Sequence, residues 1–277
     1  MAKATRLIRE RLKEVDVVIE LLDARIPLSS RNPQIDDIVG NKPRLILFNK
    51  ADLADPAATE AWLGWFADAA QRVLPLDAAS GKGVEKIVPA CEALVREKRE
   101  ALQRRGVQPP PVRAMILGIP NVGKSTLINR LIARKAAKTG NRPGVTQQQQ
   151  WFTVRGKLQL LDTPGVLWPK FDDPEVGFRL AATGAVKDEV FDVAEVAAYT
   201  LRRLQERYKE SLFQRYRLAQ DAVEPWEWLE DIGRQRGCLV GGGEVDLEKA
   251  AAVFLHDFRT GKIGRISLEW PPTETTN

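Results

Sequence analysis

The first 120 residues combine short apolar runs with longer segments of helical periodicity. Almost continuous apolar runs occur at 15–27 (VDVVIELLDARIP), 43–50 (PRLILFNK) and 112–120 (VRAMILGIP). Such runs predict strands that are buried on both faces, as in parallel sheets. A further strand is predicted within 72–83, where RVLPLD leads into the small-residue loop AASGKG.

Amphipathic helices are predicted between these strands. In 55–70 (DPAATEAWLGWFADAA), apolar residues recur at helical spacing, which predicts that Trp62 and Trp65 face the core. The segment 84–111 predicts one amphipathic helix with a strongly basic end, which stops at Gly106 and three prolines. Because consecutive prolines cannot continue a helix, we interpret this run as a linker.

The second half of the chain changes in character. Residues 151–165 (WFTVRGKLQLLDTPG) alternate and turn sharply, which predicts a pair of strands. Strands and helices in this order predict an α/β fold with a doubly wound, mostly parallel sheet. After about residue 170 the pattern is helical without a clear strand. We therefore predict two domains, an α/β domain at 1–174 and an all-helical domain at 175–277.

The composition is that of an ordinary globular protein. The 277 residues are 44% hydrophobic and 29% charged, and no apolar run is long enough to span a membrane. The N-terminal segment MAKATRLIRERLKEV lacks the apolar core of a secretory signal, and the acidic Glu14 and Asp16 argue against an organellar transit segment. We expect a cytoplasmic monomer without membrane partners.

Cysteine and histidine usage excludes several kinds of site. Cys91 and Cys238 are the only cysteines, and His256 is the only histidine. Two distant cysteines suit a reducing compartment, and we interpret both as small buried side chains. A single histidine excludes most histidine-based metal sites and catalytic triads. The net charge of +5 permits contact with nucleic acid without requiring it.

The segment 118–126 (GIPNVGKST) carries a phosphate-binding motif of the form G-x4-G-K-[ST], placed between an apolar strand and a predicted helix. Its glycines let backbone N–H groups converge on phosphate oxygens. Lys124 adds a positive charge toward the β- and γ-phosphates, Ser125 offers a hydroxyl to Mg²⁺, and Thr126 begins the helix that points at the anion. The candidate phosphate-binding residues are Asn121, Val122, Gly123, Lys124, Ser125 and Thr126.

Two further segments complete a candidate magnesium and γ-phosphate site. The segment 162–165 (DTPG) matches the D-x-x-G element of GTPases, in which Asp162 holds Mg²⁺ through water and Gly165 donates its N–H to the γ-phosphate. In the polar segment 138–150, Thr146 is the candidate to reach Mg²⁺ when GTP is bound. A solvated loop threonine is the alternative interpretation. The predicted catalytic residues are Lys124, Thr146 and Gly165.

The segment 47–53 (LFNKADL) is a candidate guanine-recognition motif of the form N-K-x-D. Guanine presents its N1–H and 2-amino group side by side, so that one carboxylate, here Asp52, accepts from both, whereas adenine cannot satisfy it. Asn49 is expected on the other edge of the base, with the Lys50 stem over the ring. The candidate base-binding residues are Asn49, Lys50, Ala51 and Asp52, together with Ala78, whose backbone N–H would reach the guanine oxygen.

The order of these motifs, with the base-recognition motif before the phosphate loop, resembles the YlqF/RbgA family of circularly permuted GTPases. The resemblance implies a circularly permuted P-loop GTPase domain, hydrolysis of GTP to GDP with Mg²⁺, and late assembly of the large ribosomal subunit. It also implies a helical C-terminal domain that contacts ribosomal RNA. The resemblance is carried by 23–33 (DARIPLSSRNP), 49–53 (NKADL), 118–131 (GIPNVGKSTLINRL), 140–146 (GNRPGVT), 162–170 (DTPGVLWPK), 180–188 (LAATGAVKD) and 241–251 (GGGEVDLEKAA).

Three features refine this expectation. Val166 stands where Ras-like GTPases place a water-orienting glutamine, so we expect hydrolysis that is slow alone and stimulated by the ribosomal particle. Asn121 is similar to an asparagine that coordinates K⁺ in related GTPases. Family members commonly begin WFPGHMAKA, whereas this sequence begins at the Met of that segment. Either the true start lies upstream of this Met, or GTP hydrolysis does not need the histidine that stands directly before it in those family members.

Two alternatives remain beside an RNA–protein assembly factor. One is a P-loop ATPase or kinase with a coincidental NKAD, and the other is a GTPase switch that acts on protein partners without RNA. Basic residues interleaved with tyrosines suit phosphate contact and base stacking, although a solvated helix face explains any single arginine as well. The basic residues are Arg202, Arg203, Arg207, Lys209, Arg215 and Arg217, and the tyrosines are Tyr199, Tyr208 and Tyr216.

Overall fold

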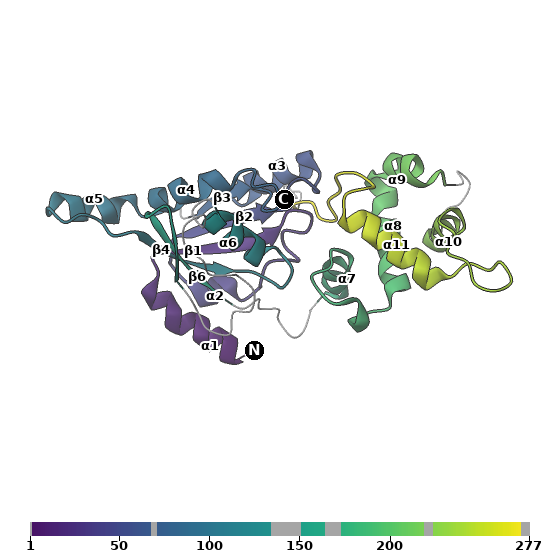
Figure 1. Cartoon of the computed structure of the whole chain (residues 1–277), viewed down its shortest axis with the longest axis horizontal. Coiled ribbons are helices and arrows are strands. Elements are labelled where there is room, and N and C mark those ends of the chain that lie inside the picture. Colours follow the sequence, from purple (N-terminus) through teal and green to yellow (C-terminus); the bar gives the residue numbers. More distant parts are fainter. Residues whose placement is uncertain (1, 68–70, 134–150, 164–172, 219–223, 273–277) are drawn as a thin grey trace, which may run out of the picture.

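The computed structural model describes residues 2–67, 71–133, 151–163, 173–218 and 224–272. Its N-terminal part is a six-stranded sheet flanked by helices, and its C-terminal part is helical (Figure 1). The strands are β1 (Val17–Asp23), β2 (Arg44–Asn49), β3 (Gln71–Pro75), β4 (Val112–Leu117), β5 (Trp151–Val154) and β6 (Leu158–Asp162).

The strand order is β3-β2-β1-β4-β6-β5. All neighbouring strands pair in parallel except the short edge strand β5, which is antiparallel to β6. The predicted strands, the strand pair after residue 150 and the doubly wound α/β class are confirmed. In sequence order, strands β1–β3 form one half of the sheet and strands β4–β6 form the other half. The two halves join through the parallel pair of β1 and β4.

Helices cover both faces of the sheet because side chains alternate along the strands. On β1, Val17, Ile19 and Leu21 belong to the core under α4 and α6, whereas Val18 belongs to the core under α1 and α2. Complete burial of each such side chain contributes about 1.5–3 kcal/mol. These helices are α1 (Ala2–Arg11), α2 (Ile35–Val39), α3 (Pro56–Trp65), α4 (Ile87–Leu94), α5 (Arg96–Arg104) and α6 (Lys124–Ala133).

Two expectations about these helices are wrong. The segment 84–111 does not form one helix, because the chain leaves helical geometry at Val95, between α4 and α5. Val95 is buried in the core, so tertiary packing interrupts the helix that the periodicity alone would continue. Trp62 is fully buried, but Trp65 is 46% exposed, since only one stripe of α3 faces the sheet. The burial of Cys91 and Cys238 is confirmed.

The C-terminal part agrees with the predicted helical region. Acidic side chains cap some of its helices: Asp192 accepts from the N–H of Ala194 (2.8 Å), and Asp246 accepts from the N–H of Lys249 (3.0 Å). No described helix is long and apolar enough to cross a membrane. The helices of the C-terminal part are α7 (Pro174–Ala182), α8 (Val193–Arg207), α9 (Lys209–Tyr216), α10 (Pro225–Gln235) and α11 (Leu247–Arg259). Short 3-10 turns occur in both parts, at η1 (Leu12–Glu14), η2 (Val84–Lys86) and η4 (Asp188–Val190).

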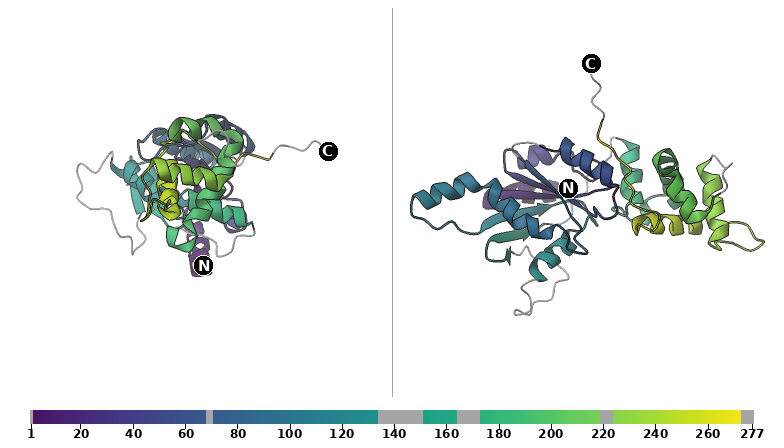
Figure 2. Two further views of the ribbon diagram at one scale, coloured as in Figure 1. Left: turned by 90° about the vertical axis from the view of Figure 1, so that its right-hand side faces the viewer. Right: turned by 90° about the horizontal axis from the view of Figure 1, so that it is seen from above.

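After α11 the chain returns to the sheet as an extended segment, 265–270, which we call the C-terminal strap (Figures 1 and 2). The Leu268 N–H donates to the carbonyl oxygen of Arg25 at 2.9 Å. One core of buried residues also continues from the sheet into α7, α8 and α11. The division of the chain at 174/175 stays a prediction, and the strap shows that its last described residues pack on the α/β part.

Candidate nucleotide-binding site

The predicted site residues gather at the carboxyl edge of the parallel strands. Asn49 is the last residue of β2, Asp162 is the last residue of β6, and the phosphate loop follows β4 directly. Asp23 ends β1 and lies in register with Asn49. Because parallel strands end at one edge of the sheet, the fold brings together motifs that are far apart in the sequence.

Lys124 lies at the start of α6 and points back along its own loop. Its Nζ donates to the carbonyl oxygens of Gly118 (2.9 Å) and Ile119 (2.7 Å). Burial lowers the pKa of Lys124 to about 8, although the Asp162 carboxylate acts in the opposite direction. A phosphate beside this buried amine would stabilise its charged form. The two residues that follow, Ser125 and Thr126, are exposed.

The phosphate loop has no space for side chains at its two motif glycines. A Cβ on Gly118 would lie 2.7 Å from the carbonyl oxygen of Leu21 on β1. Gly123 has φ +107°, and a Cβ there would lie 2.2 Å from Nδ2 of Asn49. Glycine at these two positions therefore lets the loop backbone lie directly against β1 and Asn49. The buried Lys124 amine and the N-terminus of α6 at the same loop are groups that fit a nucleotide phosphate.

Asn49 joins the phosphate loop to the loop that follows β3. Its Nδ2 donates to the carbonyl oxygen of Val122 at 2.7 Å, and its Oδ1 accepts from the N–H of Ala78 at 2.9 Å. The expected contacts of Asn49 and Ala78 with the base stay predictions, and the structure shows in addition that the Asn49 side chain and the Ala78 N–H bond to each other. Asn49 thus fixes the base-recognition and phosphate-binding segments relative to each other.

Lys50 follows β2 in a left-handed backbone conformation, with φ 59°. Its ammonium lies 3.1 Å from Oδ2 of Asp23. Arg25 donates to the same carboxylate, from Nε to Oδ1 at 2.9 Å and from Nη2 to Oδ2 at 2.7 Å. Burial alone would raise the pKa of Asp23, but the Arg25 and Lys50 charges outweigh burial and hold that pKa well below its usual range. The ion pair anchors the Lys50 side chain beside the expected base position.

Asp23 and Arg25 are candidate functional residues to which the sequence alone assigned no function, although 23–33 carries part of the family resemblance. Arg25 is 1% exposed, and its Nη2 donates to the carbonyl oxygen of Thr183, beyond α7, at 3.4 Å. Its guanidinium also lies 5.4 Å from the ring centre of Phe258 on α11. Arg25 therefore connects the base-recognition side of the sheet to the helical part. The available signal was an Asp-x-Arg pattern at the end of a buried strand.

Asp52 and Ala51 lie in the loop that follows β2. The Asp52 side chain is exposed, and partial burial together with the neighbouring Asp77 carboxylate raises its pKa. Two N–H donors from guanine would offset this repulsion. Asp77 in turn accepts from the N–H of Ala79 at 2.8 Å and shapes the loop that follows β3.

Asp162 ends β6 beside the phosphate loop. Burial raises its pKa, while the Lys124 charge and the N–H of Thr163 act in the opposite direction. The Asp162 carboxylate and the Ser125 hydroxyl are hard oxygen ligands of the kind that Mg²⁺ prefers. Three residues of the expected site lie outside the residues that the structure describes, namely Thr146, Gly165 and Val166.

Asn121 connects the phosphate loop to the helical part. It has φ 55°, and its Nδ2 donates to the carbonyl oxygen of Gly184 at 3.1 Å. Because a carbonyl oxygen only accepts, the amide nitrogen makes this contact and Oδ1 lies on the other side of the amide. This orientation is compatible with the expected K⁺ ligand at Asn121, which stays a prediction.

The basic segment in α8 and α9 does not offer its tyrosines for stacking. Tyr208 and Tyr216 are buried, and Tyr199 stacks on Phe178 with a centroid distance of 5.0 Å. The expected interleaved aromatic surface is therefore absent from this segment, because the tyrosines hold the helices together. Arg203 pairs with Glu175 and Arg215 pairs with Asp257, whereas the exposed basic residues are Arg202, Arg207, Lys209 and Arg217.

Comparison with known proteins identifies the family. A sequence profile described as 50S ribosome-binding GTPase matches residues 113–218. The chain is 52% identical to ribosome biogenesis GTPase A of Priestia megaterium over 272 residues, which cover 98% of this chain and 94% of that protein. The chain belongs to the ribosome biogenesis GTPase A family. Membership of a GTPase family assigns guanine nucleotide binding and GTP hydrolysis, and gives no support to an ATPase or a kinase.

The similarity to the ribosome biogenesis GTPase A family extends to distant relatives and to solved structures. Mitochondrial ribosome-associated GTPase 1 of Mus musculus is 34% identical over 290 residues, which cover 97% of this chain and 88% of that protein. The GNP-bound crystal structure of YlqF from Thermotoga maritima matches with a TM-score of 0.66 and 29% identity, over 97% of this chain and 98% of that chain. The match spans both parts of the chain, in agreement with the circularly permuted order.

Proposed function

We propose that this protein hydrolyses GTP as a cytoplasmic monomer and uses its nucleotide state to control binding to the large ribosomal subunit during assembly. The observation that best supports a nucleotide site is the pair of hydrogen bonds made by Asn49, because they join the base-recognition motif to the phosphate loop at one edge of the sheet. Relatives named for ribosome biogenesis and the 50S ribosome-binding profile support the ribosomal partner.

The base and phosphates would be held by different groups. Asp52 would accept from guanine N1–H and the 2-amino group, while Lys50, anchored on Asp23, would lie against the ring. Backbone N–H groups of the phosphate loop and the start of α6 would surround the phosphates. The proposed phosphate-binding residues are Asn121, Val122, Gly123, Lys124, Ser125, Thr126 and Gly165.

The reaction needs charge stabilisation as the bond to the γ-phosphate breaks. Lys124 would place its ammonium beside the β- and γ-phosphates. Mg²⁺, when bound, would neutralise part of their charge, and we propose Ser125, Thr146 and Asp162 as its ligands, with Asp162 acting through water. Asn121 would supply an oxygen to K⁺. Without a polar residue at Val166 to orient water, hydrolysis by the isolated protein would be slow and would need the ribosomal particle.

The decisive experiment measures GTP hydrolysis by the purified chain alone, with large ribosomal subunits and with small subunits as a control, in K⁺ and in Na⁺ buffer. We expect a slow basal rate, stimulation by large subunits only, and a higher rate in K⁺. Equal rates with both subunits would contradict the ribosomal function. Equal rates in the two buffers would contradict the K⁺ site while leaving the GTPase function intact.

The inward-facing tyrosines give some support to a switch that acts on protein partners without RNA. Four exposed basic residues remain as a phosphate-contacting surface: Arg202, Arg207, Lys209 and Arg217. If this surface contacts ribosomal RNA, the affinity for large subunits will fall steeply with salt, and each charge-removing substitution will reduce the slope by about one. Binding that does not depend on salt would favour the protein-partner alternative.

A further inference from the structure

The C-terminal strap makes several hydrogen bonds to the backbone of the loop that follows β2. Arg265 donates from Nε to the carbonyl oxygen of Ala54 at 2.9 Å and from Nη2 to the carbonyl oxygen of Ala51 at 2.8 Å. These two carbonyl groups stand on either side of Asp52 in the chain. One planar guanidinium therefore spans the segment that carries the base-recognition carboxylate.

Further hydrogen bonds connect the strap and α8 to the rest of this loop. The N–H of Ile266 donates to the carbonyl oxygen of Leu53 at 2.9 Å, and the N–H of Asp55 donates to Oγ of Ser267 at 3.1 Å. The Tyr208 hydroxyl, from the junction of α8 and α9, donates to Oδ2 of Asp55 at 3.0 Å. Burial and the Asp55 carboxylate raise the pKa of Tyr208 to about 12, so its hydroxyl stays a donor.

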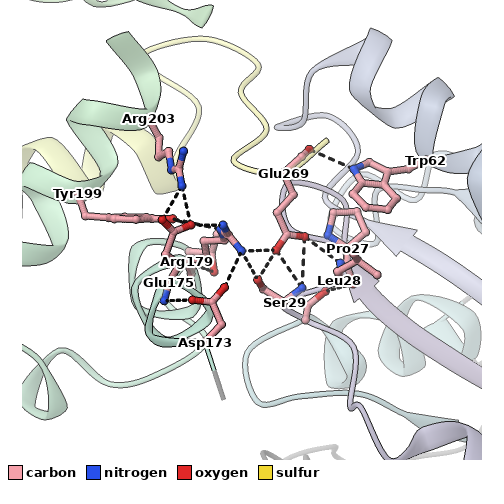
Figure 3. A network of polar contacts seen from close by, with 12 residues as sticks. Pro27, Leu28, Ser29, Trp62, Asp173, Glu175, Arg179, Tyr199, Arg203 and Glu269 are labelled. Carbon is pink, nitrogen blue, oxygen red and sulfur yellow. Dashed lines mark hydrogen bonds and ion pairs between the residues drawn. The ribbon is translucent and has the colours of Figure 1, made fainter. Parts of the chain in front are cut away.

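The other end of the strap is fixed by the buried Glu269 (Figure 3). Its carboxylate accepts from the N–H groups of Leu28 (2.8 Å) and Ser29 (3.0 Å), and Arg179 of α7 reaches it at 3.5 Å. Its carbonyl oxygen accepts from Nε1 of Trp62 on α3 at 3.1 Å. The strap is thus held by both parts of the molecule at the point where it supports the loop.

We propose that Arg265 is a positioning residue for guanine recognition, which acts by holding the loop of Asp52 in the orientation that accepts both the N1–H and the 2-amino group. This inference rests on the proposed guanine-nucleotide function. Ala51 and Ala54 pack in the hydrophobic cluster beside β2, whereas Asp52 between them is exposed. The backbone carbonyl groups of Ala51, Leu53 and Ala54 all accept hydrogen bonds from the strap, so the orientation of the exposed Asp52 segment depends on these bonds. The base site is consequently completed by residues from the far end of the chain.

The number of hydrogen bonds that Asp52 makes to the base provides a specific readout. Hypoxanthine has the N1–H of guanine but lacks the 2-amino group, so inosine diphosphate (IDP) forms one fewer bond with Asp52. The ratio of GDP affinity to IDP affinity therefore reports the orientation of this carboxylate. A general loss of stability lowers both affinities alike and leaves the ratio unchanged.

The experiment compares the full chain with Arg265→Ala, and with Arg234→Ala as a matched control. Arg234 is an exposed arginine on α10 whose partners are its neighbours Glu230 and Asp231. Titration with GDP, IDP and ADP should show that Arg265→Ala weakens GDP binding by about tenfold and IDP binding by only about two- to threefold, as expected for a misaligned double hydrogen bond. Arg234→Ala should match the wild type.

A second variant keeps the test decisive if Arg265→Ala does not fold. Arg265→Lys keeps the charge but cannot bridge the two carbonyl groups as a guanidinium does, so it should also lower the GDP-to-IDP ratio. An unchanged ratio in the folded variant, even with a lower melting temperature, would overturn the positioning role. A wild-type chain that binds ADP as tightly as GDP would instead overturn the guanine-nucleotide function.

Discussion

Lys124 and Asp23 are buried charged residues, and their partners differ in kind. Lys124 is held by carbonyl dipoles, so burial dominates and its pKa falls to about 8. Asp23 faces two full positive charges, Arg25 and Lys50, which outweigh burial and lower its pKa. The first residue gains a partner when phosphate binds, whereas the second is already satisfied within the protein.

Nucleotide binding should therefore take up a proton at Lys124 above pH 8. Below about pH 8 the amine is charged with and without nucleotide, and affinity does not depend on its titration. Above that value the free protein loses the proton, while the adjacent phosphates keep the bound amine charged, so affinity should fall as pH rises. Calorimetry of GDP binding at pH 7.0 and 8.5, in buffers of different ionisation enthalpy, measures the uptake. It should disappear in Lys124→Arg, which serves as the control.

Replacing Asp23 by Asn should destabilise the fold strongly. Arg25 would lose its carboxylate while 1% exposed, and Lys50 would lose its anchor, so we expect a loss of about 3–5 kcal/mol in the free energy of unfolding. Because the folded-state pKa of Asp23 is lowered, its contribution is present above pH 4 and is lost as pH falls through the folded value. Urea denaturation at pH 7 tests this, and a change below 1 kcal/mol would contradict the buried ion pair.

Among the elements, the phosphate loop, which connects β4 to α6, lies unusually close to the neighbouring strands. Gly118 lies against the backbone of β1, and Gly123 lies against the side chain at the end of β2. The loop therefore packs on two neighbouring strands as well as on its own helix. The Asn49 bridge adds the loop that follows β3, so hydrogen bonds join the ends of β2, β3 and β4 at the carboxyl edge.

Gly118→Ala should destabilise the protein because its Cβ would lie 2.7 Å from a carbonyl oxygen that cannot move without distorting β1. We expect a loss of about 1–3 kcal/mol and much weaker GDP binding. Gly64→Ala in α3 is the matched control, since nothing lies within 4 Å of its Cβ. Gly64 lies in the last turn of α3, so that change should stabilise the protein by less than the roughly 1 kcal/mol expected in a helix interior. Thermal unfolding of both variants measures these changes. Equal melting temperatures for the two variants would show that the close contact at Gly118 is unimportant.

At the scale of the whole molecule, the two parts of the chain are connected at several places around the nucleotide site. Asn121 and Arg25 reach the segment after α7, and the strap reaches the loop that follows β2. One hydrophobic core also runs through both parts. Residues at the nucleotide site therefore contact the helical part directly, and the helical part is the one that we propose to contact the ribosome.

These connections predict that the two parts unfold together. In hydrogen exchange, the most protected amides of β1 and α11 should open with the same free energy. Glu269→Ala would leave the N–H groups of Leu28 and Ser29 without their acceptor, lowering stability by about 2–4 kcal/mol and making the two elements open separately. Replacement of the exposed Glu60 by alanine is the control. Equal opening free energies in Glu269→Ala would contradict the coupling.

Local patterns in the amino-acid sequence were enough to predict many elements and motifs. Buried strands, amphipathic helices and the glycines of the phosphate loop follow from short-range spacing, so the sheet class and most candidate residues were predictable. Four features became visible only in the folded chain: the break at Val95, the inward-facing tyrosines, the Asn49 bridge and the hydrogen bonds of Arg265 to the Asp52 loop. Each of these depends on contacts between residues far apart in the chain, and such contacts leave no periodic signal in one sequence.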